Sequence, residues 1–309
     1  MRAWTAIAAA AIVLSAARPS GATDFDLLDA RSMGMGGAIR SIALSTSALY
    51  MNPAGITMTQ AYHLETAYIF DDKYKMHMVG ASVVDSVTSR LGMGLGYFFR
   101  WVGDGRESSK MQLHNLFLGL AYAIIPKLSV GVNMHYIRAR MDYAQPGEIE
   151  PDAVVRPYGR ALDAFSLDVG LTFHIIKNIG LAVVGYNLTH PNSAVAPTLL
   201  GLSAFARVAF VTVCFDVVLD FVSGRKLWDQ DKPVAPRYMA GTEFFLGDHW
   251  PLRAGYSFSE VSTSHSVHGG VGYVGKKGSI EASMSYELNP GNDRERDFRL
   301  AISIRYFAF

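Results

Sequence analysis

The sequence predicts an all-β fold, a transmembrane antiparallel β-barrel of about fourteen strands that follows a short N-terminal segment. Two observations carry most of this prediction. After residue 60 the chain repeats segments of about ten residues in which apolar and polar side chains alternate, with turn-forming residues between them. Half of the 309 residues are hydrophobic, yet beyond the first 22 no apolar run reaches the ~18–20 residues of a membrane helix.

The first 22 residues have the features of a secretory signal peptide. Arg2 supplies a short positive region, residues 3–17 are apolar, and Ser20-Gly21-Ala22 are the small residues of a cleavage site. We therefore expect an exported protein whose mature chain begins near Thr23. The chain then divides into a signal peptide (1–22), an N-terminal segment (23–60) and the barrel (61–309).

The N-terminal segment contains the most distinctive stretch of the sequence, residues 29–56. Three glycines fall within four residues, and glycine permits positive φ and close approach of another backbone. Ser and Thr at 45–47 are expected to cap a short apolar helix, which an Asn-Pro pair ends and a glycine reverses. The positions concerned are Gly34, Gly36, Gly37, Asn52, Pro53, Ala54 and Gly55. Such a stretch suits a chain threaded through a narrow space.

This stretch resembles the N-terminal plug of the FadL/TodX-type outer-membrane transporters and of the related PorV-like barrels. Those families open with an Asp-Ala-Arg-x-x-Gly-x-Gly-Gly-Ala-like run and a Tyr-x-Asn-Pro-Ala-Gly-like helix end, matched here by residues 29–38 and 50–55. The resemblance implies a monomer in the outer membrane, with residues 23–60 as plug, that passes small hydrophobic compounds such as long-chain fatty acids. In the PorV-like group it implies instead a docking or shuttle partner for secreted proteins. The shared motif does not separate these two functions.

The alternation predicts fourteen strands, an even number as in single-chain bacterial barrels. They are expected at 61–70, 74–85, 90–101, 111–123, 127–140, 161–175, 179–188, 199–207, 210–221, 236–246, 251–259, 265–274, 278–287 and 297–309. One boundary stays open, because residues 207–210 contain no Gly, Pro, Asn or Asp to turn the chain. Residues 199–221 are therefore either two strands or one long bent strand. The long polar connections 141–160 and 223–235 are expected at the outer rim.

A soluble β-sandwich would alternate in the same way, so periodicity alone does not establish a membrane barrel. Aromatic residues near strand ends, such as Tyr62, Tyr97 and Trp101, favour the barrel because they would form girdles at the membrane interfaces. A terminal strand ending in Phe309 resembles the signal that the outer-membrane assembly machinery reads. Phe307 and Phe309 have the opposite phase to the apolar face, which leaves either a register shift or a weak signal.

Seven charged residues within the strands are expected to face the lumen and to pair, because a charge on the lipid face costs ~2–4 kcal/mol near the midplane. They are Glu65, Glu243, Arg253, Glu281, Glu287, Arg299 and Arg305. In the hairpin centred on Asp248, Glu243 and Arg253 each lie five residues from the centre, so we predict a lumen ion pair between them.

Two further expectations concern the lumen. Three inward glycines at 92, 94 and 96 would leave a wall without side chains, against which residues 29–56 can pack. A bulky residue at Gly94 should then displace the plug. Candidate ligand contacts in an apolar pocket are Leu49, Tyr50, Met51, Phe98 and Val274.

Several functions are not supported by the sequence. The net charge of +1 and the lack of a basic run argue against nucleic-acid binding, and the single Cys214 forms no intramolecular disulfide. No Gly-x-Ser-x-Gly or His-Glu-x-x-His motif occurs. His135, Asp168 and His174 are explained better as lumen groups that satisfy one another than as a catalytic set. We expect no enzyme, no cofactor and no metal; the expected partners are membrane lipid, a hydrophobic ligand and the assembly machinery.

Overall fold

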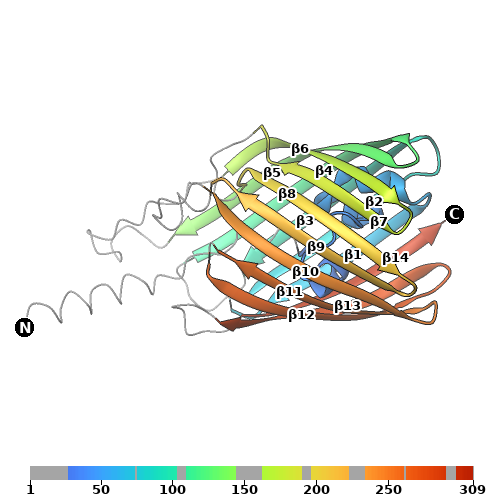
Figure 1. Ribbon diagram of the computed structural model, residues 1–309. Helices are drawn as coiled ribbons and strands as arrows, with labels where there is room; N and C mark the ends of the chain where they lie inside the picture. Colours follow the sequence, from blue (N-terminus) through green and yellow to red (C-terminus); the bar gives the residue numbers. More distant parts are fainter. Residues whose placement is uncertain are drawn as a thin grey trace, which may run out of the picture.

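Fourteen antiparallel strands form a closed barrel among the residues that the computed structural model describes (Figure 1). These residues are 27–73, 75–102, 109–143, 162–189, 196–222, 234–260, 262–289 and 297–308. Each strand pairs with its neighbours in sequence, and β1 pairs with β14 to close the sheet. The strands are β1 (Tyr62–Asp71), β2 (Met76–Asp85), β3 (Leu91–Val102), β4 (Ser109–Ile125), β5 (Leu128–Tyr143), β6 (Leu162–Ile176), β7 (Ile179–Tyr186), β8 (Leu199–Val208), β9 (Val211–Asp220), β10 (Ala235–Leu246), β11 (Trp250–Ser259), β12 (Ser264–Val274), β13 (Gly278–Asn289) and β14 (Phe298–Ala308).

The two ends of the barrel differ in their connections. At one end, which we call the turn end, short turns such as 126–127, 177–178 and 209–210 join the strands. The opposite end, which we call the loop end, is where strands such as β3, β5 and β9 end and where β4, β6 and β10 begin. The predicted signal peptide, most of the two long polar connections and Phe309 lie outside the described residues.

The predicted all-β barrel is confirmed, and the open boundary within residues 199–221 is resolved as two strands. Val208 pairs with Val211, so β8 and β9 are joined by the two-residue turn Ala209-Phe210. Ala209 has φ 50°, the left-handed region that favours glycine, in the first central position of the turn. The sequence gives no turn signal here because an alanine occupies a glycine-like conformation.

The phase of the last strand is also resolved. β14 pairs continuously with β1 from Asp71↔Arg299 to Tyr62↔Ala308, without a register shift. Phe307 is therefore opposite His63, with the ring centroids 4.8 Å apart, and both face the lumen. Phe307 lies out of phase with the apolar residues on the outer face because its side chain packs inside the barrel.

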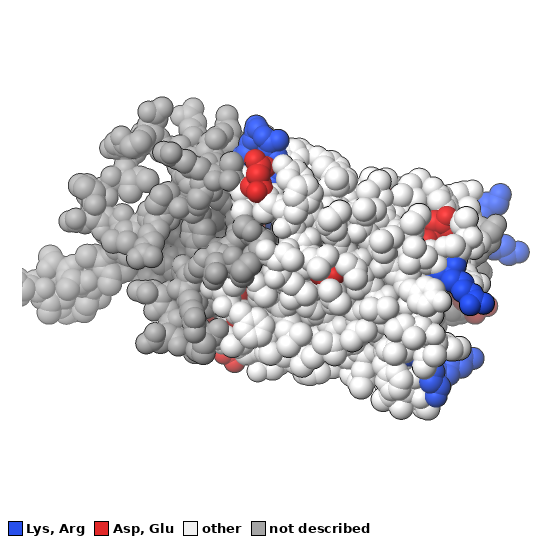
Figure 2. Space-filling model, turned by 90° about the horizontal axis from the view of Figure 1, so that it is seen from above, with Lys and Arg blue, Asp and Glu red and all other residues white. Residues whose placement is uncertain are grey.

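Side chains alternate between a buried inner face and an exposed outer face along nearly every strand. The exposed positions are largely Leu, Val, Ile, Phe and Tyr. Figure 2 shows the middle of the described wall almost without charged side chains, with most of the visible Lys and Arg at the turn end and a further basic and acidic group near the loop end. The helices in the described part of the chain are all too short or too polar to span a membrane.

Residues 27–58, which we call the lumen segment, lie inside the barrel (Figure 1). They form helix α2 (Ala30–Gly34), helix α3 (Ser45–Met51) and the 3-10 helix η2 (Pro53–Met58). Helix α2 contacts β11–β14, and α3 and η2 contact β1–β6. Most of its side chains are completely buried, so the segment and the inner wall share one hydrophobic core.

Candidate functional site

The lumen segment fits against the wall through glycines that face it from many strands. A Cβ atom at Gly131 of β5 would overlap the backbone of Pro53 and Ala54. At Gly241 of β10 it would lie 2.5 Å from the carbonyl oxygen of Met35. The other inner-wall glycines whose added Cβ would crowd the segment are Gly92, Gly94, Gly119, Gly170, Gly201 and Gly255. Glycine is required at Gly131, Gly241 and Gly255, because main-chain atoms of the segment occupy the space of a Cβ. At the other positions the nearest atoms belong to side chains, which would have to shift.

The β3 wall is one part of this ring. Leu49 of α3 approaches Gly94, where an added Cβ would lie 2.7 Å from Leu49 Cδ2, and Ile56 and Thr57 approach Gly92. The lumen segment thus lies against the glycine-lined wall, as the sequence predicts. The atoms nearest Gly94 are side-chain ends, whereas those nearest Gly131 are main-chain atoms, so Gly131 is the more sensitive position.

The glycines of the segment itself have two separate roles. Gly36 and Gly37 adopt φ 65° and 84°, where glycine is favoured. Gly34 and Gly55 do not have positive φ. A Cβ at Gly55 would overlap the carbonyl of Ala43, so this residue permits a close approach and does not reverse the chain through a left-handed conformation.

The hydroxyls at 45–47 do not cap helix α3, contrary to expectation. Its N-cap is Leu44, which makes no side-chain capping bond. Ser45 instead contacts His63, Thr46 donates to Glu65, and Ser47 donates to Asp29. These hydroxyls are needed by buried polar groups of the wall and of α2, which outweighs the local capping preference.

Seven charged side chains form one alternating chain of ion pairs that begins and ends on the lumen segment. In order they are Arg31, Glu243, Arg253, Glu281 and Arg305, with Arg305 reaching both Glu65 and Asp29. Their side chains are at most 10% exposed. Charges buried to this degree are tolerated only when paired and hydrogen-bonded, so the network ties α2 to five strands of the wall.

The predicted pair of Glu243 and Arg253 lies in the middle of this network. The two residues are directly opposite in the β10–β11 register, and Arg253 Nε lies 2.8 Å from Glu243 Oε2. Arg253 Nη1 also lies 2.6 Å from Glu281 Oε2, and Arg31 Nε lies 3.2 Å from Glu243 Oε2.

A second polar anchor holds the other side of the segment. Arg40, 1% exposed, donates from Nη1 to Asp216 Oδ2 at 3.0 Å and from Nε to the Tyr186 hydroxyl at 2.8 Å. Its backbone N–H also donates to Asp216, and the Tyr186 hydroxyl donates to the Met51 carbonyl. A buried arginine satisfied by a carboxylate and a phenol fixes this part of the segment to β7 and β9.

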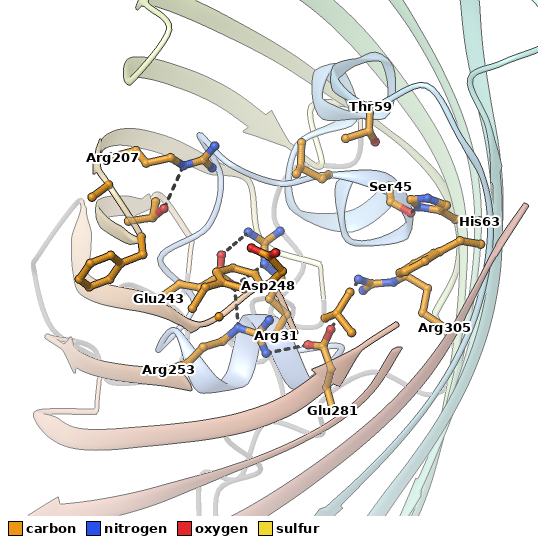
Figure 3. Close-up of a pocket in the computed structure, with 18 residues that line it drawn as sticks. Arg31, Ser45, Thr59, His63, Arg207, Glu243, Asp248, Arg253, Glu281 and Arg305 are labelled. Carbon is orange, nitrogen blue, oxygen red and sulfur yellow. Dashed lines mark hydrogen bonds and ion pairs between the residues drawn. The ribbon is translucent and has the colours of Figure 1, made fainter. Parts of the chain in front are cut away.

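A cavity of about 700 Å³ lies between the ion-pair network and the turn end (Figure 3). Arg31, Glu243, Arg253, Glu281 and Arg305 form its charged side. Its apolar side and rim are formed by Leu44, Phe210, Phe245, Val274 and Phe307. The cavity can accommodate a small molecule with both apolar and polar parts.

The five candidate ligand contacts do not come together. Leu49, Tyr50, Met51 and Phe98 pack in the shared core, where the rings of Tyr50 and Phe98 are 5.3 Å apart in an edge-to-face arrangement. Val274 lines the turn-end cavity instead. The single apolar pocket that the sequence suggested is therefore two separate regions, because the lumen segment fills the space between them.

The sequence reasoning missed the residues that anchor the segment. Asp29, Arg31 and Arg40 lie within or beside the glycine-rich motif, but their ion-pair partners are about 175 to 275 residues away. The strands do carry a signal for this network, because Glu65, Glu281 and Arg305 are charged residues at inward positions, as Glu243 and Arg253 are. Among the described residues no group of three or more His, Cys, Asp or Glu side chains is placed to hold a metal ion.

Comparison with known proteins gives structural matches. No protein-family model matches the sequence, and no curated protein matches it significantly. The monoaromatic hydrocarbon channel CymD has TM-score 0.69 and 18% identity, over 91% of this chain and 97% of the channel. The toluene transporter TbuX of Ralstonia pickettii has TM-score 0.68 and 15% identity, over 92% and 98%. The toluene transporter TodX of Pseudomonas putida has TM-score 0.63 and 14% identity, over 89% and 96%.

The sequence identities are low, whereas the structural match covers nearly the whole of each chain. This chain and the three matched proteins therefore share the fold. The chain therefore has the fold of the FadL/TodX-type barrels, as residues 29–56 predict.

Proposed function

We propose that this protein is a monomeric outer-membrane channel that passes small hydrophobic compounds through a lumen plugged by its own N-terminal segment. The observation that carries the proposal is the lumen segment, which is buried in the barrel and held by two polar anchors. A segment fitted to the wall in this way closes the lumen to water and ions, so passage requires it to move.

Three further observations support the proposal. The outer wall is apolar over its middle, as a barrel in lipid requires (Figure 2). The cavity at the turn end has room for a small molecule next to the segment. Proteins of the same fold are described as hydrocarbon channels and toluene transporters. The choice between a monoaromatic compound and a long-chain fatty acid is one that the transport test decides.

The test is uptake into proteoliposomes with and without the purified protein, using radiolabelled toluene and radiolabelled oleate in parallel. We expect faster entry of at least one compound, and no increase for a hydrophilic solute of similar size such as glycerol. Equal rates with and without the protein for both hydrophobic compounds would contradict the proposal. They would favour the PorV-like docking role, in which the barrel binds secreted proteins and transports no small molecule.

A further inference from the structure

The inner faces of β4, β5 and β6 carry the same sequence of residue types from the loop end toward the lumen segment: apolar residues first, then polar residues (followed on β4 by Phe117), then a glycine. The residues, in that direction, are Met111, Leu113, Asn115, Phe117 and Gly119 on β4; Ala139, Ile137, His135, Asn133 and Gly131 on β5; and Leu162, Ala164, Ser166, Asp168 and Gly170 on β6. The apolar residues nearest the loop end pack together as one cluster. The glycines contact the lumen segment. A group of polar residues lies between the apolar cluster and the segment.

We call these residues, Asn115, Asn133, His135, Ser166 and Asp168, the polar belt. His135 is directly opposite Ser166 across the β5–β6 pair, and Asn133 is directly opposite Asp168. All five are at most 3% exposed. The belt therefore lies on the loop-end side of the lumen segment, on the buried inner face of β4, β5 and β6.

Several hydrogen-bonding atoms of the belt have no partner among the described residues. The Asp168 carboxylate is satisfied, because it accepts from the Asn187 backbone N–H at 2.8 Å and from Asn133 Nδ2 at 3.3 Å. The unpartnered atoms are Asn115 Oδ1, Asn133 Oδ1, Ser166 Oγ and both ring nitrogens of His135. His135 Nε2 lies 3.3 Å from Asp168 Oδ1 but does not form a hydrogen bond with it.

An unpartnered polar group inside a protein is costly, so such groups are rare and require an explanation. Here several occur side by side, and aromatic rings border them. The Phe117 ring stacks on His135, with centroids 5.2 Å apart and an interplanar angle of 7°, and Phe98 meets Phe117 edge to face at 5.8 Å. The belt thus combines unused hydrogen-bonding atoms with an aromatic wall.

We infer that the polar belt is a binding site for a small, uncharged aromatic compound that carries a hydroxyl group. The two amide oxygens accept hydrogen bonds and cannot donate them, so their partner must supply a donor. The ring of the compound would pack against the Phe117 side of the site and the apolar cluster. This inference deepens the proposed function and rests on it for the route of entry, since it names the class of compound that the channel prefers.

The test compares three compounds of similar size: p-cresol, which has a hydroxyl donor; 4-methylanisole, which has only an acceptor; and toluene, which has neither. Binding of each radiolabelled compound to the full-length protein in nanodiscs is measured, with the signal of empty nanodiscs subtracted. We expect p-cresol to bind about tenfold more tightly than either of the others. Equal affinities for all three compounds would overturn the inference, and this comparison requires no variant.

Variants then locate the site. Ser166→Ala and Asn115→Leu each remove an unpartnered polar atom, and we expect each to lower the p-cresol preference about threefold or more. Ser166→Ala should leave the ligand-free protein at least as heat-stable, because the Ser166 hydroxyl has no hydrogen-bond partner among the described residues. The matched control is Ser82→Ala, another inward and buried serine on β2, which should keep the full preference. A preference unchanged in both belt variants, in protein that runs as a folded barrel, would show that the compound binds elsewhere.

The two proposals fail in different ways. Selective binding of p-cresol without uptake of any compound would refute transport and leave the site standing. Uptake of toluene and p-cresol at equal rates, with no binding preference, would refute the site and leave the channel standing. If p-cresol is not preferred although the Ser166→Ala variant is stabilised, the belt holds water only, and the inference is wrong.

Discussion

At the scale of single residues, the lumen is organised by charges whose partners lie on different strands. Arg253 is the central member of the ion-pair chain, because it bridges Glu243 and Glu281. Both carboxylates are at most 4% exposed, so neither can turn to water if the guanidinium is removed. The other arginines of the network are already engaged, and Arg305 lies 3.9 Å from Glu281.

Replacement of Arg253 should therefore be costly. We expect Arg253→Met to lower the free energy of unfolding by about 3–5 kcal/mol, because buried Glu281 loses its partner at 2.6 Å and buried Glu243 keeps only the ion pair with Arg31. The measurement is the urea midpoint of the unboiled, fast-migrating form on gels. The control is Asp163→Asn, which breaks the exposed Arg138–Asp163 pair on the outer face and should cost less than about 1 kcal/mol. A similar cost for both variants would mean that the lumen is wet enough to solvate the network.

At the scale of elements, the lumen segment packs closely against the barrel wall because glycines on the inner face leave room for it. Neighbouring inner-face glycines on β4, β5 and β6 (Gly119, Gly131 and Gly170) accommodate η2 and the residues just before it. On the opposite wall Gly241 and Gly255 accommodate the turn after α2. The fit is tightest where main chain meets main chain, since a backbone cannot rotate aside as a side chain does.

A methyl group at Gly131 should consequently displace the segment. We expect Gly131→Ala to cost about 1–3 kcal/mol and to make proteoliposomes leaky to small solutes, because the added Cβ would overlap the Pro53 backbone. Conductance across a planar bilayer is the measurement. Gly269→Ala is the matched control, since an added Cβ at this position meets nothing within 4 Å. Unchanged conductance in Gly131→Ala would mean that the segment can shift without opening a path.

At the scale of the whole molecule, closure of the sheet leaves no strand with an unpaired edge, because β1 and β14 pair with each other. The exposed apolar outer face is the kind of surface that a barrel presents to lipid. A closed barrel of this kind resists unfolding by detergent until it is heated. We expect the protein to fractionate with outer membranes and to migrate faster unboiled than boiled. Recovery in the soluble periplasm with a single band under both conditions would contradict the proposed location.

The sequence by itself determined the barrel. Period-2 alternation is a local property of each strand, so the approximate position of each strand follows from it, and only the division of residues 199–221 was left open. The register of the β10–β11 hairpin was also readable, because its turn is short and its centre at Asp248 fixes which residues face each other. The turn at Ala209 could not be read, since its alanine adopts a conformation that the surrounding sheet imposes.

Only the tertiary structure decided how the lumen is filled. Asp29, Arg31 and Arg40 find their partners on strands far away in sequence, and spacing along the chain does not encode such meetings. The same holds for the serine and threonine hydroxyls of α3, which serve the wall in place of their own helix. Alternation tells which side chains point inward. It does not tell which of the inward polar side chains bond to the lumen segment and which stay without a partner, because that depends on the path of the segment through the barrel.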